Sequence, residues 1–141
     1  MARFIAAPLT FQEALPVYSL LIDHLSTAVL QLNRELCIEY LNPSAEMMLE
    51  VSRRRIYGQD LAAAFSEDDV SRSALLSAIE SGHAFTKREA EISLTTGKTL
   101  LCDYNVTPVM GALNNTDSLL IELHPRDRMK RISQEDELIA N

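Results

Sequence analysis

The chain has 141 residues, a length typical of one domain with a single hydrophobic core. Hydrophobic residues make up 47% and charged residues 23%, which excludes disordered and low-complexity classes. The net charge of -7 disfavours direct binding of nucleic acid, and there is no apolar run long enough to span a membrane. Because two cysteines are too few for a disulfide scaffold, we expect a cytoplasmic protein.

The first predicted element is an amphipathic helix that ends near Leu25, because apolar residues recur there at helical spacing. A domain of this size has little room to bury so long a stripe within itself. We therefore expect the stripe to form the interface of a two-fold homodimer. Its residues are Phe11, Leu15, Tyr18, Ile22 and Leu25.

Two short strands are predicted next, over residues 26–32 and 36–41, joined by a polar turn. Asn42 then begins a helix, because asparagine is a good N-cap and Pro43 suits the first helical position. We expect this helix to end at the basic cluster of residues 53–55. That cluster is interpreted as a solvated helix end, with an anion site as the less favoured alternative.

The middle of the chain predicts a short helical turn over residues 60–65 and a helix over residues 70–81 that Gly82 ends. From His83 the hydrophobic period changes to two, which predicts a strand up to Leu94 and further strands over residues 99–110 and 118–123. The tail after Pro125 has helical composition. Met129, Ile132 and Ile139 in it have coiled-coil spacing, which Asp136 weakens.

This order of elements predicts an α+β fold with one antiparallel five-stranded sheet, short helices on one face, and flanking N- and C-terminal helices. No catalytic constellation is visible. The three histidines, His24, His83 and His124, lie far apart and lack metal-ligand spacing, so no metal site is predicted. The four glycines are scattered singly, which excludes a glycine-rich phosphate loop.

The element order resembles the PAS domain, and several short motifs carry the resemblance. They are Leu41-Asn42-Pro43-Ser44-Ala45-Glu46 at a strand exit, Gly58-Gln59-Asp60-Leu61, the turn Gly97-Lys98, and the strand Asp103-Tyr104-Asn105-Val106-Thr107-Pro108-Val109. The resemblance implies a domain over residues 15–124, an N-terminal extension over residues 1–14, and a linker helix over residues 125–141.

Three further segments resemble the NtrB family of nitrogen-regulation sensor histidine kinases: residues 25–30, 53–58 and 124–135. This resemblance implies a non-catalytic sensory and dimerisation fragment. The full protein would be an ATP-dependent kinase that phosphorylates and dephosphorylates an NtrC-like response regulator under control of a PII-like signal protein. The family's histidine motif and ATP boxes are missing from this chain.

We expect no cofactor in the fragment. The neighbourhood of residues 53–56 lacks the reactive cysteine of flavin photosensors, and the helix over residues 70–81 lacks a histidine for haem. The alternative is a cofactor- or metabolite-binding PAS sensor of another signalling protein. Its pocket between helices and sheet would be lined by Met47, Met48, Leu61, Phe65, Leu75, Leu76, Ile79, Leu101 and Ile121, although a plain packed core explains the same residues.

Overall fold

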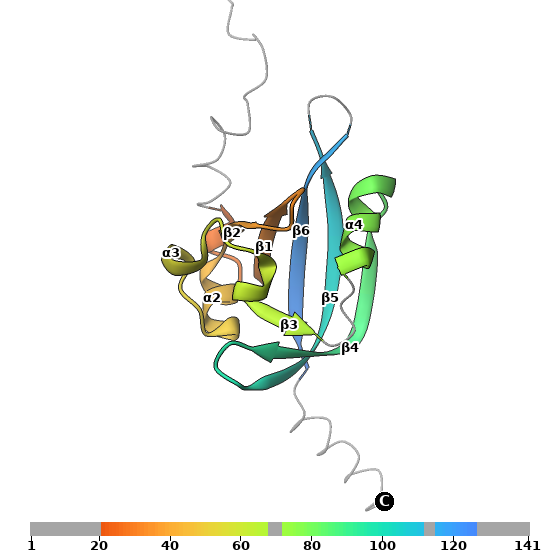
Figure 1. Cartoon of the computed structure of the whole chain (residues 1–141). Helices are drawn as coiled ribbons and strands as arrows, with labels where there is room; N and C mark the ends of the chain where they lie inside the picture. Colours follow the sequence, from red (N-terminus) through yellow and green to blue (C-terminus); the bar gives the residue numbers. More distant parts are fainter. Residues whose placement is uncertain (1–20, 68–71, 112–114, 127–141) are drawn as a thin grey trace, which may run out of the picture.

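The computed structural model describes residues 21–67, 72–111 and 115–126. Within these ranges the chain forms one curled antiparallel sheet with short helices packed against it (Figure 1). The strands are β1 (Ala28–Asn33), β2 (Ile38–Leu41), β3 (Phe65–Glu67), β4 (Phe85–Leu94), β5 (Thr99–Met110) and β6 (Thr116–Pro125). The helices are α2 (Pro43–Leu49), α3 (Arg53–Ile56), the 3-10 turn η2 (Leu61–Ala63) and α4 (Arg72–Ser81). The predicted α+β class is confirmed.

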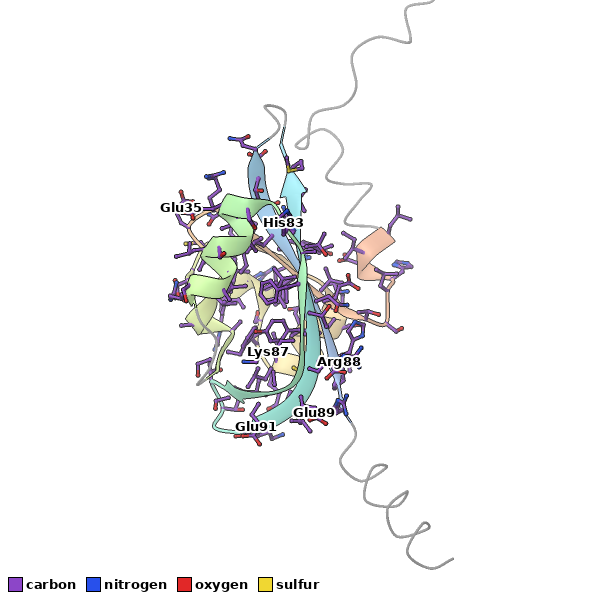
Figure 2. The ribbon with its side chains drawn as sticks, turned by 90° about the vertical axis from the view of Figure 1, so that its right-hand side faces the viewer. Glu35, His83, Lys87, Arg88, Glu89 and Glu91 are labelled. Carbon is purple, nitrogen blue, oxygen red and sulfur yellow. The ribbon has the colours of Figure 1, made fainter. Side chains whose placement is uncertain are left out.

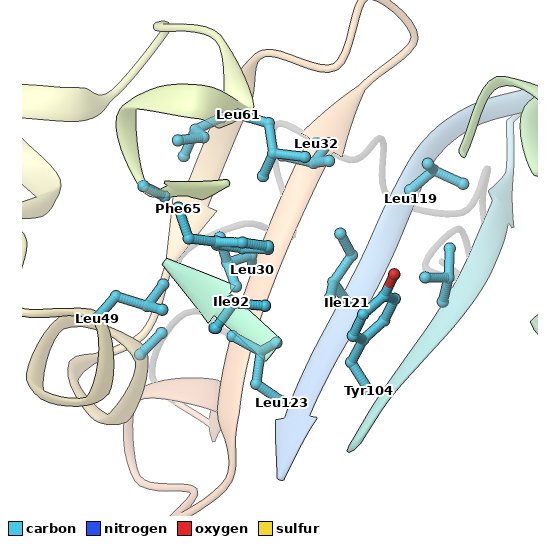
Figure 3. Close-up of a cluster of buried hydrophobic side chains, with 14 of the residues drawn as sticks. Leu30, Leu32, Leu49, Leu61, Phe65, Ile92, Tyr104, Leu119, Ile121 and Leu123 are labelled. Atoms are coloured by element: carbon cyan, nitrogen blue, oxygen red, sulfur yellow. The ribbon is translucent and has the colours of Figure 1, made fainter. Parts of the chain in front are cut away.

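The strand order is β2-β1-β6-β5-β4-β3, so the first and last strands pair at the centre of the sheet. In this register Leu30 lies opposite Ile121, and Ile121 lies opposite Val106. All three side chains are buried. Figure 3 shows Leu30 and Ile121 within the core. The core is therefore built on one face of the sheet from residues that are far apart in sequence.

The described part of the chain has six strands, where five were predicted. The additional strand, β3, pairs with β4 and contains Phe65, which we expected in a helical turn. The turn ends earlier, at Ala63, and Phe65 instead lies opposite Leu94 with both side chains buried. The strand is too short to show a period of its own, so only its pairing partner defines it.

The helix after Asn42 is also shorter than predicted, and the basic cluster belongs to a separate helix. Helix α2 ends at Glu50, whose φ of 56° is left-handed, and the Glu50 N–H bonds back to the Glu46 carbonyl. Val51 is β-branched and follows directly, which disfavours continuation of the helix. Helix α3 then begins at Arg53.

The helices pack on the face of the sheet that carries the core: α2 against β1, and α4 against β5 and β6. Strand β5, which was predicted with its observed bounds, alternates between the two faces. Cys102, Tyr104 and Val106 are buried on the core face, and the residues between them are half-buried on the opposite face. Figure 1 shows this second face without a layer of labelled helices over it.

Candidate functional site

The junction between the N-terminal helix and the sheet is organised by one side chain, Asn42, which is fully buried. Its Oδ1 accepts the N–H of Ala45 at 3.0 Å, as expected of an N-cap, and also the N–H of Val29 at 2.9 Å. Its Nδ2 donates to the carbonyls of Thr27 at 2.8 Å and Ile22 at 3.1 Å. The amide therefore connects the last turn of the N-terminal helix, the start of β1 and the start of α2.

Two further contacts attach the same helical turn, which covers residues 21–23, and the residues that follow it. The Ser44 hydroxyl donates to the Leu25 carbonyl at 2.8 Å. Arg53 reaches from α3 over the ring of Tyr40, 5.3 Å from the ring centroid, and its Nη1 lies 3.8 Å from Asp23 Oδ1. The N-terminal helix is thus joined to α2 and α3 as well as to the sheet.

The expected dimer stripe lies only partly within the described residues. Phe11, Leu15 and Tyr18 fall outside them. Ile22 is half-buried beside the Asn42 amide, and Leu25 is 49% exposed. The neighbouring apolar side chains Leu21 and Met47 are 61% and 81% exposed. The visible end of the helix therefore presents apolar surface in the single chain.

Five of the expected pocket residues are buried and belong to one continuous hydrophobic cluster, part of which Figure 3 shows, and Met48 packs against its edge. They are Leu61, Phe65, Leu75, Ile79 and Ile121.

For three other positions the expected lining of this inner space is wrong. Met47 and Leu76 lie on the outer surfaces of their helices, and Leu76 is 44% exposed. Leu101 lies on the opposite face of the sheet, because Cys102 beside it takes the buried place on the core face.

A cleft of about 570 Å³ opens at a different place, between α2, α3 and the β4–β5 turn. Its charged lining side chains are Glu46, Glu50 and Arg55. Glu46 Oε2 accepts the N–H of Arg53 at 2.9 Å, which holds the start of α3, and Glu50 pairs with Lys98 at 2.8 Å. No local pattern in the sequence indicates this cleft, because its residues come from α2, α3, the segment that ends in η2, and a distant turn.

A second feature without a signal in the sequence is a charged cluster where β6 ends. Arg126 Nε lies 2.9 Å from Asp103 Oδ1, and its Nη1 lies 3.2 Å from Glu89 Oε1. Figure 2 shows Arg88 and Glu89 along β4 on this part of the sheet. Hydrogen bonds from the Arg126 guanidinium and then from the Glu89 N–H hold the pKa of Asp103 below its usual value. Bonding to Asp103 in turn raises the pKa of Arg126.

The lowered pKa of Asp103 predicts a stability contribution that acid removes. A carboxyl whose pKa is lower in the folded state stabilises the protein above its unfolded pKa of about 3.9. That contribution is lost as the pH falls through the lower folded value. We expect Asp103→Asn to reduce the free energy of urea unfolding at pH 7, and this difference to shrink in a second measurement at an acid pH below the unfolded pKa. An equal difference at both pH values contradicts the assignment.

Clustered metal ligands and membrane-spanning helices are both absent from the described ranges. No group of three or more potential His, Cys, Asp or Glu ligands gathers among these residues. Cys37 is half-buried and Cys102 is buried, and the two form no disulfide with each other. None of the helices in this part of the chain is long and apolar enough to cross a membrane.

Comparison with known proteins gives consistent matches. The family model described as PAS fold matches residues 18–126. The sensory histidine kinase/phosphatase NtrB of Vibrio alginolyticus is 28% identical over 117 residues, which cover 83% of this chain and 33% of the relative. NtrB of Escherichia coli O157:H7 is 25% identical over 82% of this chain and 31% of the relative. The chain therefore spans about a third of the length of these relatives.

Solved structures extend the comparison to the fold. The crystal structure of the PAS domain of nitrogen regulation protein NR(II) from Vibrio parahaemolyticus superposes with a TM-score of 0.63 at 28% identity. The match covers 78% of this chain and 98% of that domain. A LOV protein from Rhodobacter sphaeroides has a TM-score of 0.70 at 16% identity, over 83% of this chain and 69% of that one, which shows a shared fold alone.

Proposed function

The chain belongs to the PAS fold family, and we propose that it is the sensory and dimerisation domain of an NtrB-like sensor histidine kinase in nitrogen regulation. The observation that carries the proposal is the 28% identity to the PAS domain of a nitrogen regulation protein, over 98% of that domain. In this proposal the fragment catalyses no reaction. Residues 125–141 connect it to a dimerisation and ATP-binding kinase region outside this chain.

The full protein, in the same proposal, phosphorylates and dephosphorylates an NtrC-like response regulator and responds to a PII-like signal protein. The NtrB relatives are described as histidine kinase/phosphatases, which supports a two-component role. A test is to extend the gene downstream of Asn141 and assay the product for ATP-dependent autophosphorylation. A downstream sequence without a phosphorylatable histidine helix would overturn the proposal.

We further propose that the domain works without a tightly bound cofactor. The five buried residues expected to line a pocket belong instead to one hydrophobic core cluster, which supports this view. Native mass spectrometry and an absorption spectrum of the purified chain test it. A mass increment or a visible absorption band would instead favour the cofactor- or metabolite-binding PAS sensor.

Dimerisation is the part of the proposal that one truncation tests directly. We expect the chain to be a dimer at micromolar concentration, and removal of residues 1–20 to give a monomer by light scattering. This boundary keeps the Ile22 carbonyl that bonds Asn42, so that the truncated domain retains its junction. A second test of the same interface is the triple variant Phe11→Glu, Leu15→Glu, Tyr18→Glu, which replaces the apolar stripe but keeps residues 1–20 in the chain. A truncated chain that remains dimeric shows that the interface lies elsewhere.

A further inference from the structure

Three strands meet where the chain leaves the sheet, and Arg126 is the residue that joins them. Its backbone N–H donates to the Leu101 carbonyl at 2.8 Å, so pairing with β5 continues one residue beyond the end of β6. Its side chain turns back over the sheet to Asp103 on β5 and Glu89 on β4. The position of Arg126 therefore depends on all three strands.

The contact with Asp103 is a two-point one. Arg126 Nε donates to Asp103 Oδ1 at 2.9 Å, and Nη2 donates to Oδ2 at 3.3 Å. A planar guanidinium that engages both carboxylate oxygens fixes direction as well as distance, which a single-point pair does not. By contrast, the neighbouring His124 Nε2 and Glu122 Oε2 are 4.0 Å apart.

The same carboxylate also holds a bulge in β4. The pairing of β4 with β5 shifts between Lys87 and Ala90, and Glu89 within the bulge has a left-handed φ of 53°. The Glu89 N–H donates to Asp103 Oδ1 at 2.8 Å, and the Glu89 carboxylate meets Arg126. A bulge redirects side chains out of the regular alternation, and here it directs Glu89 toward the exit of β6.

We propose that Asp103 is a positioning residue that couples the β4 bulge to the point where the chain leaves the domain. Arg126, Asp103 and Glu89 form an ionic latch that sets the direction of the backbone at Arg126, directly after β6. The regulatory meaning of the latch rests on the proposed function, in which residues 125–141 lead to the kinase region. The Arg126 and Asp103 side chains are 33% and 28% exposed, so the latch is weak enough to open without unfolding the sheet.

Two substitutions of Asp103 separate the latch from the bulge. Asp103→Asn keeps an oxygen for the Glu89 N–H but loses the charge that Arg126 needs. Asp103→Ala loses both. By amide hydrogen exchange in NMR spectra of the full chain, we expect Asp103→Asn to speed exchange at Arg126 about five- to tenfold and to leave Glu89 unchanged. Asp103→Ala is expected to speed exchange at both residues.

Arg126→Gln should reproduce the Asp103→Asn effect at Arg126, and the double variant should add nothing further, because both remove one interaction. Arg126→Lys keeps the charge but not the two-point contact, so its effect should be intermediate. The matched control is Glu122→Gln, which removes one negative charge from the same end of the sheet and should leave Arg126 exchange unchanged.

Unchanged exchange at Arg126 in Asp103→Asn overturns the latch, and so does faster exchange spread evenly over the sheet, which indicates general loss of stability. Light scattering of the same samples reports on dimerisation independently. If the wild-type chain is monomeric but shows the expected exchange pattern, the dimerisation part of the proposed function is contradicted and the structural latch is still supported.

Discussion

Asn42→Ala is expected to lower the free energy of unfolding by about 3–5 kcal/mol, more than loss of an ordinary helix cap. The substitution removes four hydrogen bonds from a side chain that is fully buried. It also leaves the buried N–H of Val29 and the Thr27 carbonyl without their partner. Urea unfolding followed by circular dichroism measures the change.

Two further variants give the comparison, one at Asn42 itself and one at the neighbouring Ser44. Asn42→Asp keeps the two acceptor bonds to Val29 and Ala45 but turns a carboxylate toward two carbonyls, so we expect a destabilisation as large as that of alanine at pH 7. Ser44→Ala removes only the single bond to the Leu25 carbonyl and should cost about 1 kcal/mol. An Asn42→Ala loss no larger than that of Ser44→Ala would show that the junction contributes little.

Leu30→Ala is expected to lower the free energy of unfolding by about 3–5 kcal/mol. Leu30 is fully buried in β1 and lies opposite Leu41 on one side and Ile121 on the other. Both neighbours belong to paired strands in the sheet, which limits how far they can close the space left behind. The expected loss is the sum of two costs: the lost transfer free energy of the removed side-chain atoms, and the cost of the cavity that remains.

The matched control for Leu30 is Leu101→Ala, the same substitution on the opposite face of the sheet. Leu101 is half-buried there, so the expected loss is about 1 kcal/mol. Thermal and urea unfolding of the two variants give the comparison. Equal losses from the two substitutions would contradict the observed assignment of the two faces.

The error at Leu101 shows where periodicity fails. Leu100 and Leu101 are consecutive leucines at the start of a strand, and either phase of a period of two places one of them on the core face. Leu100 packs against the core, and Leu101 does not. In contrast, the bounds of β5 were predicted correctly because polar turns flank the strand.

Local chemistry explains which part of the junction could be predicted. The N-cap bond from Ala45 to Asn42 lies within one turn and follows from residue type. The bonds to Ile22, Thr27 and Val29 depend on how the N-terminal helix meets the sheet, which no local pattern specifies. The contact between Asp103 and Arg126 has the same origin, because only strand pairing brings β5 and the end of β6 together.

The central position of β6 has a consequence for synthesis of the protein. Strand β1 is made among the first described elements and β6 is the last, yet β6 pairs with the whole of β1, from Ala28 to Asn33. Leu30 and Leu32 therefore stay without their β6 partners until nearly the entire domain has left the ribosome. Pairing across so long a stretch of chain is slow to form. Until it forms, the unpaired apolar strand β1 is open to association with other chains.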